Sequence, residues 1–573
     1  MLRARSRTPT RVSGRTYPAS PPKMTSTPSP GGCPPCSPAQ SEKARRYDRQ
    51  LRLWGDHGQI LLEKSHVCLL HANATGTEIL KSLVLPGVGA FTIVDDKKVS
   101  GEDLGNNFFL EESDLDQNRG EVAARLLLEL NPEVRGDCVD DCPEQILRAE
   151  PNFFLGFNIV IACEAREDTL KTISKMLWIE GIPLITVRTY GFISYIRLQI
   201  KEHTIVEAHP DNIIEDLCLD MPFPALKEFF DSQDLSKMNK KEHAHTPYVV
   251  ILFKALQIWM QNQNTNKLPH NYKERNVVKG ILNQLRLTND EGIPEHEENF
   301  DEALKATNTA LHNNQLSSHV IGMFKNECCD KLTSDSTDFW IICRSIRDFV
   351  QLPDNGRLPV RGIIPDMFSD TERYVTLQNI YKEKAKADAN LVYKFVQEHL
   401  ESVGRQSDSI SETTVRLFCR NSFDLRVIRS NCSISDEYDK YESSELKTIL
   451  ENNSESDLVY YFILRGVDKF YTEFSSYPGS IEYLLESDIS KLKNCVSKVL
   501  SDYGLSGLLG GVVKDEYIHE ITRYGASEPH VMAAFIGGCA AQEVIKLLTR
   551  QYVPINNLFL YNAMKSESLT AHI

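Results

Sequence analysis

Residues 66–95 constrain the fold of this chain more than any other stretch. Apolar runs at 66–72 and 90–95 predict two strands, with a helix over 76–85 and a turn at Pro86-Gly87 between them. Two strands joined through a helix within about thirty residues form a βαβ unit, and the strands of such a unit lie parallel. This pattern places the chain in the α/β class.

The alternation of strands and helices continues on both sides of a long, different middle region. We predict helices at 118–130, 168–180 and 531–548, and strands at 157–163, 183–187 and 553–562. Alternation of this kind is typical of a doubly wound, parallel-rich, Rossmann-like sheet. The middle is richer in polar helices, such as 297–311 and 381–400. We therefore expect one α/β domain interrupted by a large, mostly helical insertion.

These patterns divide the chain of 573 residues into four parts. Residues 1–44 are rich in Pro, Ser and Arg and have no acidic residue before Glu42, so we expect a disordered tail. Residues 45–200 form the first part of the α/β domain, 201–500 the helical insertion and 501–573 the closing part.

Charge and cysteine usage exclude several classes of protein. The net charge of -15 argues against nucleic acid or an anionic membrane as the main partner. We find no apolar run as long as a membrane span. The 14 cysteines lack a disulfide-like spacing, which is typical of free thiols in a reducing compartment. We expect a soluble protein of the cytoplasm or nucleus.

The turn after the first strand bears on whether this fold holds a nucleotide. A phosphate-binding turn uses three glycines, for the tight turn, for close approach of phosphate and for helix packing. Here the turn reads HANATG, so only the third glycine remains, at Gly76. Side chains at His71 and Asn73 stand where phosphate approaches, although Asn can adopt a left-handed conformation. Asp95 could still hold a ribose. A retained fold is favoured over a retained nucleotide site.

Several motifs resemble those of the ubiquitin-activating enzyme superfamily and bracket the chain from residue 44 to its end. They lie at 46–55 (RYDRQLRLWG), 77–81 (TEILK) and 537–546 (GGCAAQEVIK). A closer similarity, to the regulatory subunits of neddylation-activating enzymes, lies at 101–110 (GEDLGNNFFL), 358–368 (LPVRGIIPDMF) and 523–530 (RYGASEPH). The resemblance implies an adenylation-type domain that works in neddylation as one half of a heterodimer.

The same resemblance implies that this half does not adenylate alone. Catalytic members keep an Asp-x-Asp, an Asn-x-Asn-Arg-Gln and a later acid around magnesium and ATP. This chain keeps Asp95 and a basic residue at Arg119, but has Lys97 for the second aspartate, 103–107 (DLGNN) for the asparagine motif and Ala165 for the later acid. Magnesium needs oxygen ligands, which lysine and alanine lack. We expect no cofactor on this chain and magnesium-ATP on the partner.

The acceptor cysteine of catalytic members is normally followed by threonine, and none of the 14 cysteines here is. The resemblance therefore assigns the thioester to the partner, and the insertion to a catalytic-cysteine-like domain without its cysteine. It also implies that Arg49 reaches across the dimer to the partner's ATP, where a guanidinium suits charge developing on phosphates. A partner-binding segment is expected at Leu358, Pro359, Asp366, Met367, Leu377 and Asn379.

The alternatives differ in what they need from the sequence. An independent activating enzyme needs the intact turn and magnesium acids, and a nicotinamide-dependent oxidoreductase is opposed by His71 and Asn73. A regulatory subunit for SUMO or ubiquitin fits the motifs less closely, because the SUMO type lacks so large an insertion. A pure scaffold differs from the main interpretation only in whether Arg49 touches ATP. The expected partners are a catalytic subunit and a ubiquitin-like modifier, without nucleic acid or membrane.

Overall fold

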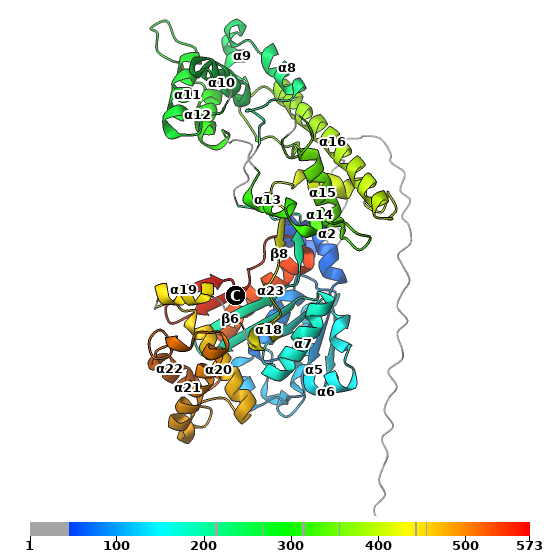
Figure 1. The fold of residues 1–573 in the computed structure, drawn as a ribbon, viewed down its shortest axis with the longest axis vertical. Coiled ribbons are helices and arrows are strands. Elements are labelled where there is room, and N and C mark those ends of the chain that lie inside the picture. Colours follow the sequence, from blue (N-terminus) through cyan, green and yellow to red (C-terminus); the bar gives the residue numbers. More distant parts are fainter. Residues whose placement is uncertain are drawn as a thin grey trace, which may run out of the picture. The chain divides into compact units, whose positions relative to one another are not determined.

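The computed structural model describes residues 45–211, 216–265, 267–311, 316–353, 356–439, 441, 444–453 and 455–573 (Figure 1). The tail expected at 1–44 lies outside the described residues. The chain divides after Arg49 into two units, which are described separately. Helix α2 (Asp48–Lys64) runs across this division and is kinked at Gly55, which has a φ of 63°.

An eight-stranded sheet forms the core of the α/β part, in the order β10-β9-β6-β5-β4-β1-β2-β3. The strands β3, β2, β1, β4 and β5 are parallel, and β6, β9 and β10 continue the sheet in antiparallel register. The parallel-rich α/β fold is thus confirmed. The bounds are β1 (His66–Leu70), β2 (Ala90–Val94), β3 (Arg135–Val139), β4 (Ile159–Ala162), β5 (Leu184–Tyr190), β6 (Ile193–Gln199), β9 (Leu558–Asn562) and β10 (Glu567–Ala571).

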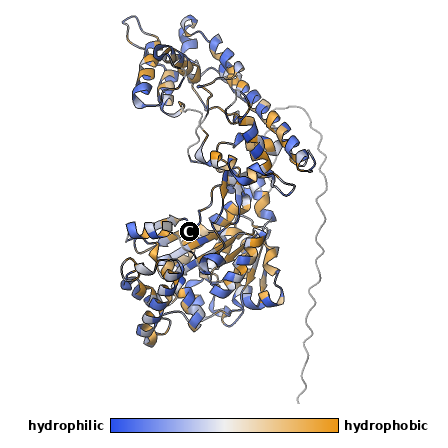
Figure 2. Ribbon diagram, viewed as in Figure 1, coloured by the Kyte–Doolittle hydropathy of each residue, from blue (hydrophilic) through white to orange (hydrophobic). Residues whose placement is uncertain are grey.

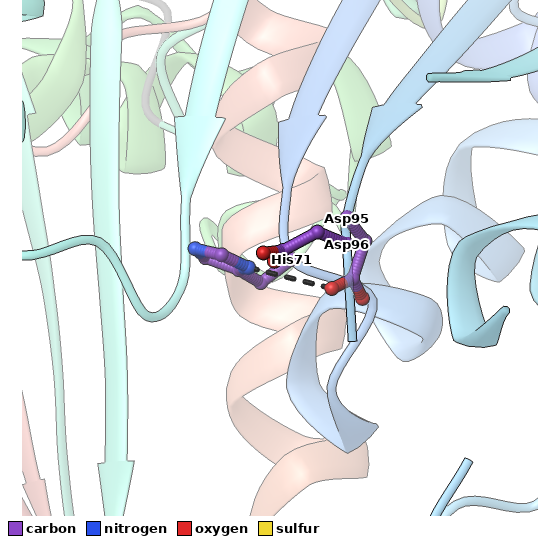
Figure 3. Close-up of side chains that lie close together, drawn as sticks. All are labelled: His71, Asp95 and Asp96. Carbon is purple, nitrogen blue, oxygen red and sulfur yellow. Dashed lines mark hydrogen bonds and ion pairs between the residues drawn. The ribbon is translucent and has the colours of Figure 1, made fainter. Parts of the chain in front are cut away.

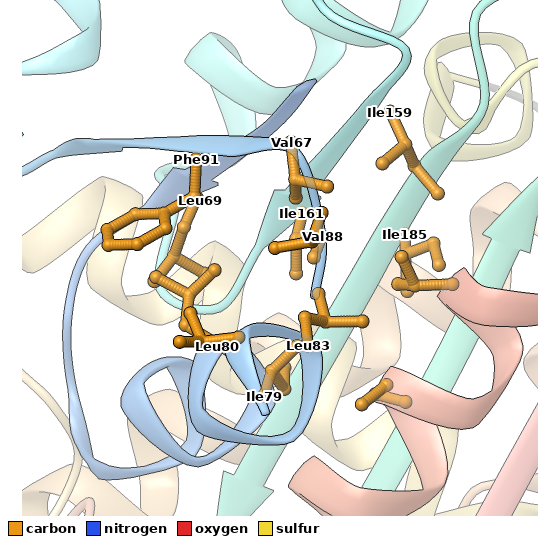
Figure 4. Packing of buried hydrophobic residues seen from close by; sticks show 14 of the residues in the cluster. Val67, Leu69, Ile79, Leu80, Leu83, Val88, Phe91, Ile159, Ile161 and Ile185 are labelled. Atoms are coloured by element: carbon orange, nitrogen blue, oxygen red, sulfur yellow. The ribbon is translucent and has the colours of Figure 1, made fainter. Parts of the chain in front are cut away.

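Successive side chains of the central strands enter two different hydrophobic clusters, because they point to opposite faces of the sheet. In β1, Val67 and Leu69 belong to one cluster, and Cys68 and Leu70 to the other. Strand β4 alternates in the same way. Figure 4 shows the first of these clusters, in which Leu69 points toward Leu80 and Val67 lies beside Ile161. Because both faces of these strands are buried, their residues are apolar at successive positions, which explains the continuous apolar runs in the sequence.

Helices cover both faces. Helices α3 (Ala74–Val84), α5 (Arg119–Leu130) and α23 (His530–Thr549) contribute to the first cluster, and α6 (Pro143–Ala149) and α7 (Glu167–Glu180) to the second. The expectation that no apolar run is as long as a membrane span was wrong by composition, because helix α23 is long and apolar enough to cross one, but more than half of its most apolar window is buried in the structure. A Cβ at Gly537 would lie 2.8 Å from the Cβ of Glu78, so this glycine permits the close contact of α23 with α3.

The middle of the chain is mostly helical, as expected. Its helix α16 contributes Leu377 and Tyr381 to one cluster and Val392 and Val396 to another, so the two share this helix. The bounds are α8 (Pro224–Ser232), α9 (Lys240–Ala244), α10 (Tyr248–Gln263), α11 (Tyr272–Leu285), α12 (Glu298–Thr309), α13 (Ser318–Phe324), α14 (Glu327–Asp330), α15 (Asp338–Val350), α16 (Thr371–Ser402) and α17 (Glu412–Arg420). Strands β7 (His203–Ile205) and β8 (Arg426–Ile428) pair separately.

Four of the helices that follow β8, α19 to α22, pack on the antiparallel side of the sheet. Their apolar side chains share one cluster with Ile193 and Tyr195 of β6 and Leu558 and Leu560 of β9, whereas α18 contributes to the cluster that contains α7. Figure 2 shows hydrophobic residues concentrated along the strands of the sheet. The bounds are α18 (Ile434–Asp439), α19 (Ser444–Asn452), α20 (Val459–Phe474), α21 (Leu485–Asp502) and α22 (Asp515–Tyr524), and α4 (Gly101–Asn106) lies earlier in the chain. The sequence analysis places residues 434–500 in the insertion. In the structure, however, much of this stretch packs with the sheet.

Candidate functional site

The site expected from the sequence lies where the strand order reverses. Strand β1 pairs with β2 on one side and with β4 on the other, and in such sheets ligands bind outside the carboxyl ends of the strands at this point. The residues that follow β1, β2 and β4 here are His71, Asp95 and the Cys163-Glu164 pair. Three of the four side chains are polar, and their contacts decide what the crevice can hold.

The turn between β1 and α3 keeps its shape without its glycines. His71 has a φ of 64°, in the left-handed region that glycine tolerates best, whereas Asn73 is extended at φ -67° and ψ 179°. Asn73 caps α3, because its Oδ1 accepts from the backbone N–H of Gly76 at 2.9 Å. A Cβ at Gly76 would lie 2.7 Å from the carbonyl oxygen of His71. The structure thus explains why position 76 is a glycine.

Asp95 is fully engaged by groups of the protein itself. Its Oδ2 accepts from the backbone N–H of Ala72 and from Nε of Arg119, both at 2.8 Å, and Oδ1 accepts from the backbone N–H of Lys97 at 3.1 Å. Burial raises the pKa of Asp95, but a hydrogen bond with His71 and the charge of Arg119 outweigh burial and hold this pKa well below its ordinary value. Asp95 is therefore a permanent anion with a protein cation beside it.

Arg119 occupies the centre of the cluster. It is the first residue of α5, whose cap Asn118 donates from Nδ2 to the carbonyl oxygen of Asp95 at 2.9 Å. The buried guanidinium binds Asp95 and also Oδ1 of Asp103 at 3.0 Å. A cation at a helix amino terminus is opposed by the helix dipole, so the two carboxylates must offset that cost as well as burial.

Lys97 meets an acid that the sequence analysis did not assign. Its Nζ lies 2.9 Å from Oε2 of Glu164, while Ala165, the position aligned with the later magnesium acid, is half-buried beside it. Burial raises the pKa of Glu164, but the charges of Lys97 and Arg119 outweigh it and bring this pKa to about 2. The position of Glu164, two residues after the end of β4, was the sequence signal that could have identified it.

A second missed residue, Glu528, lies at the amino end of α3. Its Oε1 accepts from the backbone N–H of Thr75 at 3.0 Å, from Nδ2 of Asn73 at 3.1 Å and from the hydroxyl of Thr75. Burial raises the pKa of Glu528 to about 7, although hydrogen bonds from Thr75 lower it. The only signal in the sequence was the motif at 523–530, which contains this residue.

The arrangement does not fit a magnesium-nucleotide complex. His71, Asp95 and Asp96 bring potential metal-ligand atoms within 4.8 Å of one another, and Figure 3 shows His71 directed at Asp95. However, a magnesium ion needs oxygen atoms that are free to bind it. Those of Asp95 already accept from Arg119 and the backbone, and Glu164 is paired with Lys97. Protein cations stand where a metal would have to bind.

The remaining residues singled out from the sequence are Arg49, which belongs to the other unit, and those of the segment proposed for partner binding. The side chain of Arg49 is 89% exposed and has Asp48 at 3.9 Å. In the segment proposed for partner binding, Asp366 and Asn379 are exposed and Met367 is half-buried. The other three residues of that segment are buried in the chain: Leu358, Pro359 and Leu377.

Comparison with known proteins gives one consistent result. The model of the ThiF family matches residues 47–573. The chain is 50% identical over 533 residues to the NEDD8-activating enzyme E1 regulatory subunit of Danio rerio, covering 93% of this chain and 99% of that protein. It is 43% identical over 539 residues to the subunit of the same description from Drosophila melanogaster, covering 94% and 98%. It is 35% identical over 539 residues to the regulatory subunit of Caenorhabditis elegans, covering 92% of this chain and 99% of that protein.

Proposed function

This chain belongs to the family of NEDD8-activating enzyme E1 regulatory subunits, and on that premise we propose that it is the non-catalytic half of a heterodimer. Its catalytic partner binds magnesium-ATP and adenylates the carboxyl-terminal glycine of NEDD8, releasing pyrophosphate. The partner's cysteine then attacks the acyl-adenylate and releases AMP. Family membership selects NEDD8 over the SUMO and ubiquitin alternatives, and it removes the oxidoreductase.

The observation that carries the non-catalytic assignment is the ion-paired cluster at the carboxyl end of the sheet. Arg119 binds Asp95 and Asp103, and Lys97 binds Glu164. A metal ion entering this cluster would have to displace two cations from three carboxylates. The resulting charge repulsion and desolvation oppose adenylation by this half.

Arg49 is the residue that we assign to the partner's reaction. Its guanidinium is exposed, and its Nε lies 3.9 Å from a carboxylate oxygen of Asp48. An exposed ion pair of this length contributes little to stability, so the arginine is available for another contact. In the dimer it reaches the phosphates of the partner's ATP and stabilises the charge that develops during adenylation.

For the partner surface we propose the exposed apolar side chains near the amino end of α23. Val531 is 78% exposed, Phe108 is 74% exposed and Phe535 is 42% exposed. The ring of Phe108 lies 6.3 Å from that of His530, which places this residue next to the start of α23. Exposed apolar groups of this size in one region are typical of an interaction surface. We call these three residues the α23 patch, and Asp366 and Asn379 remain candidates for a second contact.

The trans role is tested with the assembled dimer. Arg49→Ala is expected to slow NEDD8-dependent adenylation about tenfold or more without changing assembly, since a preorganised cation is lost from the transition state. Lys64→Ala, which removes an exposed positive charge at the other end of α2, is the matched control. Unchanged turnover in Arg49→Ala would support a pure scaffold instead.

A further inference from the structure

The amino end of α3 is the place where a Rossmann-like fold offers hydrogen bonds to phosphate. The first N–H groups of a helix have no partner within it and carry a partial positive charge, so they attract an anion. Helix α3 has 11 residues and follows the turn that carries phosphate in related folds. Here the N–H of Thr75 is bound by Glu528 and that of Gly76 by Asn73.

The occupant is a side chain of the same protein. Oε1 of Glu528 accepts three hydrogen bonds, from Nδ2 of Asn73 and from the backbone N–H and hydroxyl of Thr75. A carboxylate oxygen at a helix amino terminus satisfies the same donors, and the same dipole, as a phosphate oxygen. Thr75 and Glu528 are 453 residues apart in the chain, so the contact is tertiary and not a local cap.

The backbone around Glu528 is held in place by further contacts. Its carbonyl oxygen accepts from Nδ2 of Asn106 at 3.2 Å, and Nδ1 of His530 lies 2.9 Å from the carbonyl oxygen of Asn106. The carbonyl oxygen of Ser527 accepts from the backbone N–H of Gly191 at 2.7 Å. The segment on both sides of Glu528 is therefore fixed to α4 and to the turn after β5.

We propose that the carboxyl group of Glu528 fills the phosphate position at the amino end of α3 and closes it to external phosphates. The chain thus blocks its former nucleotide site twice, with cations in the metal position and with its own carboxyl group in the phosphate position. This inference goes beyond the role with the partner and does not depend on it, because it concerns the isolated chain.

The test uses the full chain without partner and inorganic pyrophosphate as the probe. In Glu528→Ala the freed donors of Asn73 and Thr75 should bind pyrophosphate about tenfold more tightly than the wild type does, raising Tm as pyrophosphate is added. Glu528→Gln retains a side-chain oxygen of the same reach and should respond as weakly as the wild type. Glu516→Ala, which removes an exposed glutamate in α22, is the control.

A folded Glu528→Ala that responds to pyrophosphate no better than the wild type would overturn the proposal. So would a wild type that already binds pyrophosphate as tightly as the variant. If Glu528→Ala does not fold, Glu528→Ser takes its place, because serine is too short to fill the position. Amide exchange gives a second readout: protection of the Thr75 N–H should fall in the short variants and persist in Glu528→Gln.

Discussion

The Nζ atom of Lys97 lies 2.9 Å from Oε2 of Glu164. An ammonium group therefore stands at the place where catalytic members of the superfamily are expected to hold magnesium. The pair joins the end of β2 to the end of β4, and Arg119 lies 4.0 Å from the same carboxylate oxygen. We expect the ion pair to stabilise the fold, and under the proposed function it takes the place of the metal. Each of these consequences can be measured.

A double-mutant cycle with Lys97→Met and Glu164→Gln measures the stabilising part. We expect a coupling free energy of about 0.5 to 2 kcal/mol, because the two groups are in direct contact and only partly exposed. Urea unfolding of the four proteins provides the values. Additive changes in the free energy of unfolding would show that the contact does not stabilise the fold.

The pH dependence of stability reports on Glu528. Burial raises its folded-state pKa to about 7, the charge of Glu164 also raises it, and Thr75 and Arg119 lower it. The folded state therefore holds this proton more tightly than the unfolded state, whose pKa is near 4.5. The stabilisation of the folded state that the proton on Glu528 provides is present below pH 4.5 and is lost as pH rises through 7. Relative to Glu528→Gln, the wild type should lose stability from pH 5 to 8, and parallel unfolding curves would contradict this.

A buried ion pair on the antiparallel side of the sheet should dominate the stability of that region. Nη2 of Arg197 lies 2.6 Å from Oε2 of Glu437, and the hydroxyls of Tyr461 and Tyr503 donate to Oε1 at 2.6 and 2.7 Å. Glu437→Ala leaves a buried guanidinium without its partner, so we expect a loss of about 3 to 5 kcal/mol. Calorimetry compares this loss of stability with that of Glu412→Ala, which removes one partner of an exposed ion pair and should cost less than about 1 kcal/mol. Equal losses would refute it.

The α23 patch is tested by introducing charge. Val531→Asp or Phe535→Asp should weaken binding to the catalytic subunit at least about tenfold, because a desolvated carboxylate replaces an apolar contact. Val277→Asp, at another exposed apolar position, in α11, is the control and should bind normally. Titration calorimetry gives the affinities, and unchanged affinity in both patch variants would place the interface elsewhere.

Four of the five strands in the parallel half of the sheet, β1, β2, β4 and β5, could be predicted because each is a short apolar run between helical stretches. The predicted strand at 66–72 and helix at 76–85 match β1 and α3 to within two residues at each end. Strands buried on both faces need apolar side chains at every position, and this requirement is visible in a single sequence.

On the antiparallel side only β9 could be predicted, within the strand expected at 553–562, and β6 and β10 could not. Strand β6 has Arg197 at a fully buried position. In the sequence this arginine indicates an exposed residue, because the Glu437 that neutralises it lies 240 residues later in the chain. Strand β10 is a largely exposed edge with the sequence ESLTA, and β3 is another with RGDCV. Edge strands with polar side chains carry no apolar pattern to detect.

The candidate site was predicted in part for a similar reason. The altered turn and Lys97 are local features, so the sequence displays them. Glu164 was missed because the alignment placed the later acid one residue further on, at Ala165. Glu528 was missed because its role exists only through contacts with Asn73 and Thr75 at the other end of the chain.

NEDD8-dependent ATP–pyrophosphate exchange tests the central claim most directly, measured with this chain alone and then with the catalytic subunit added. The account predicts no exchange by the chain alone and strong exchange by the mixture, because Lys97, Arg119 and Glu528 fill the site here and the partner supplies another. Exchange by the chain alone would contradict it and show that this site still adenylates.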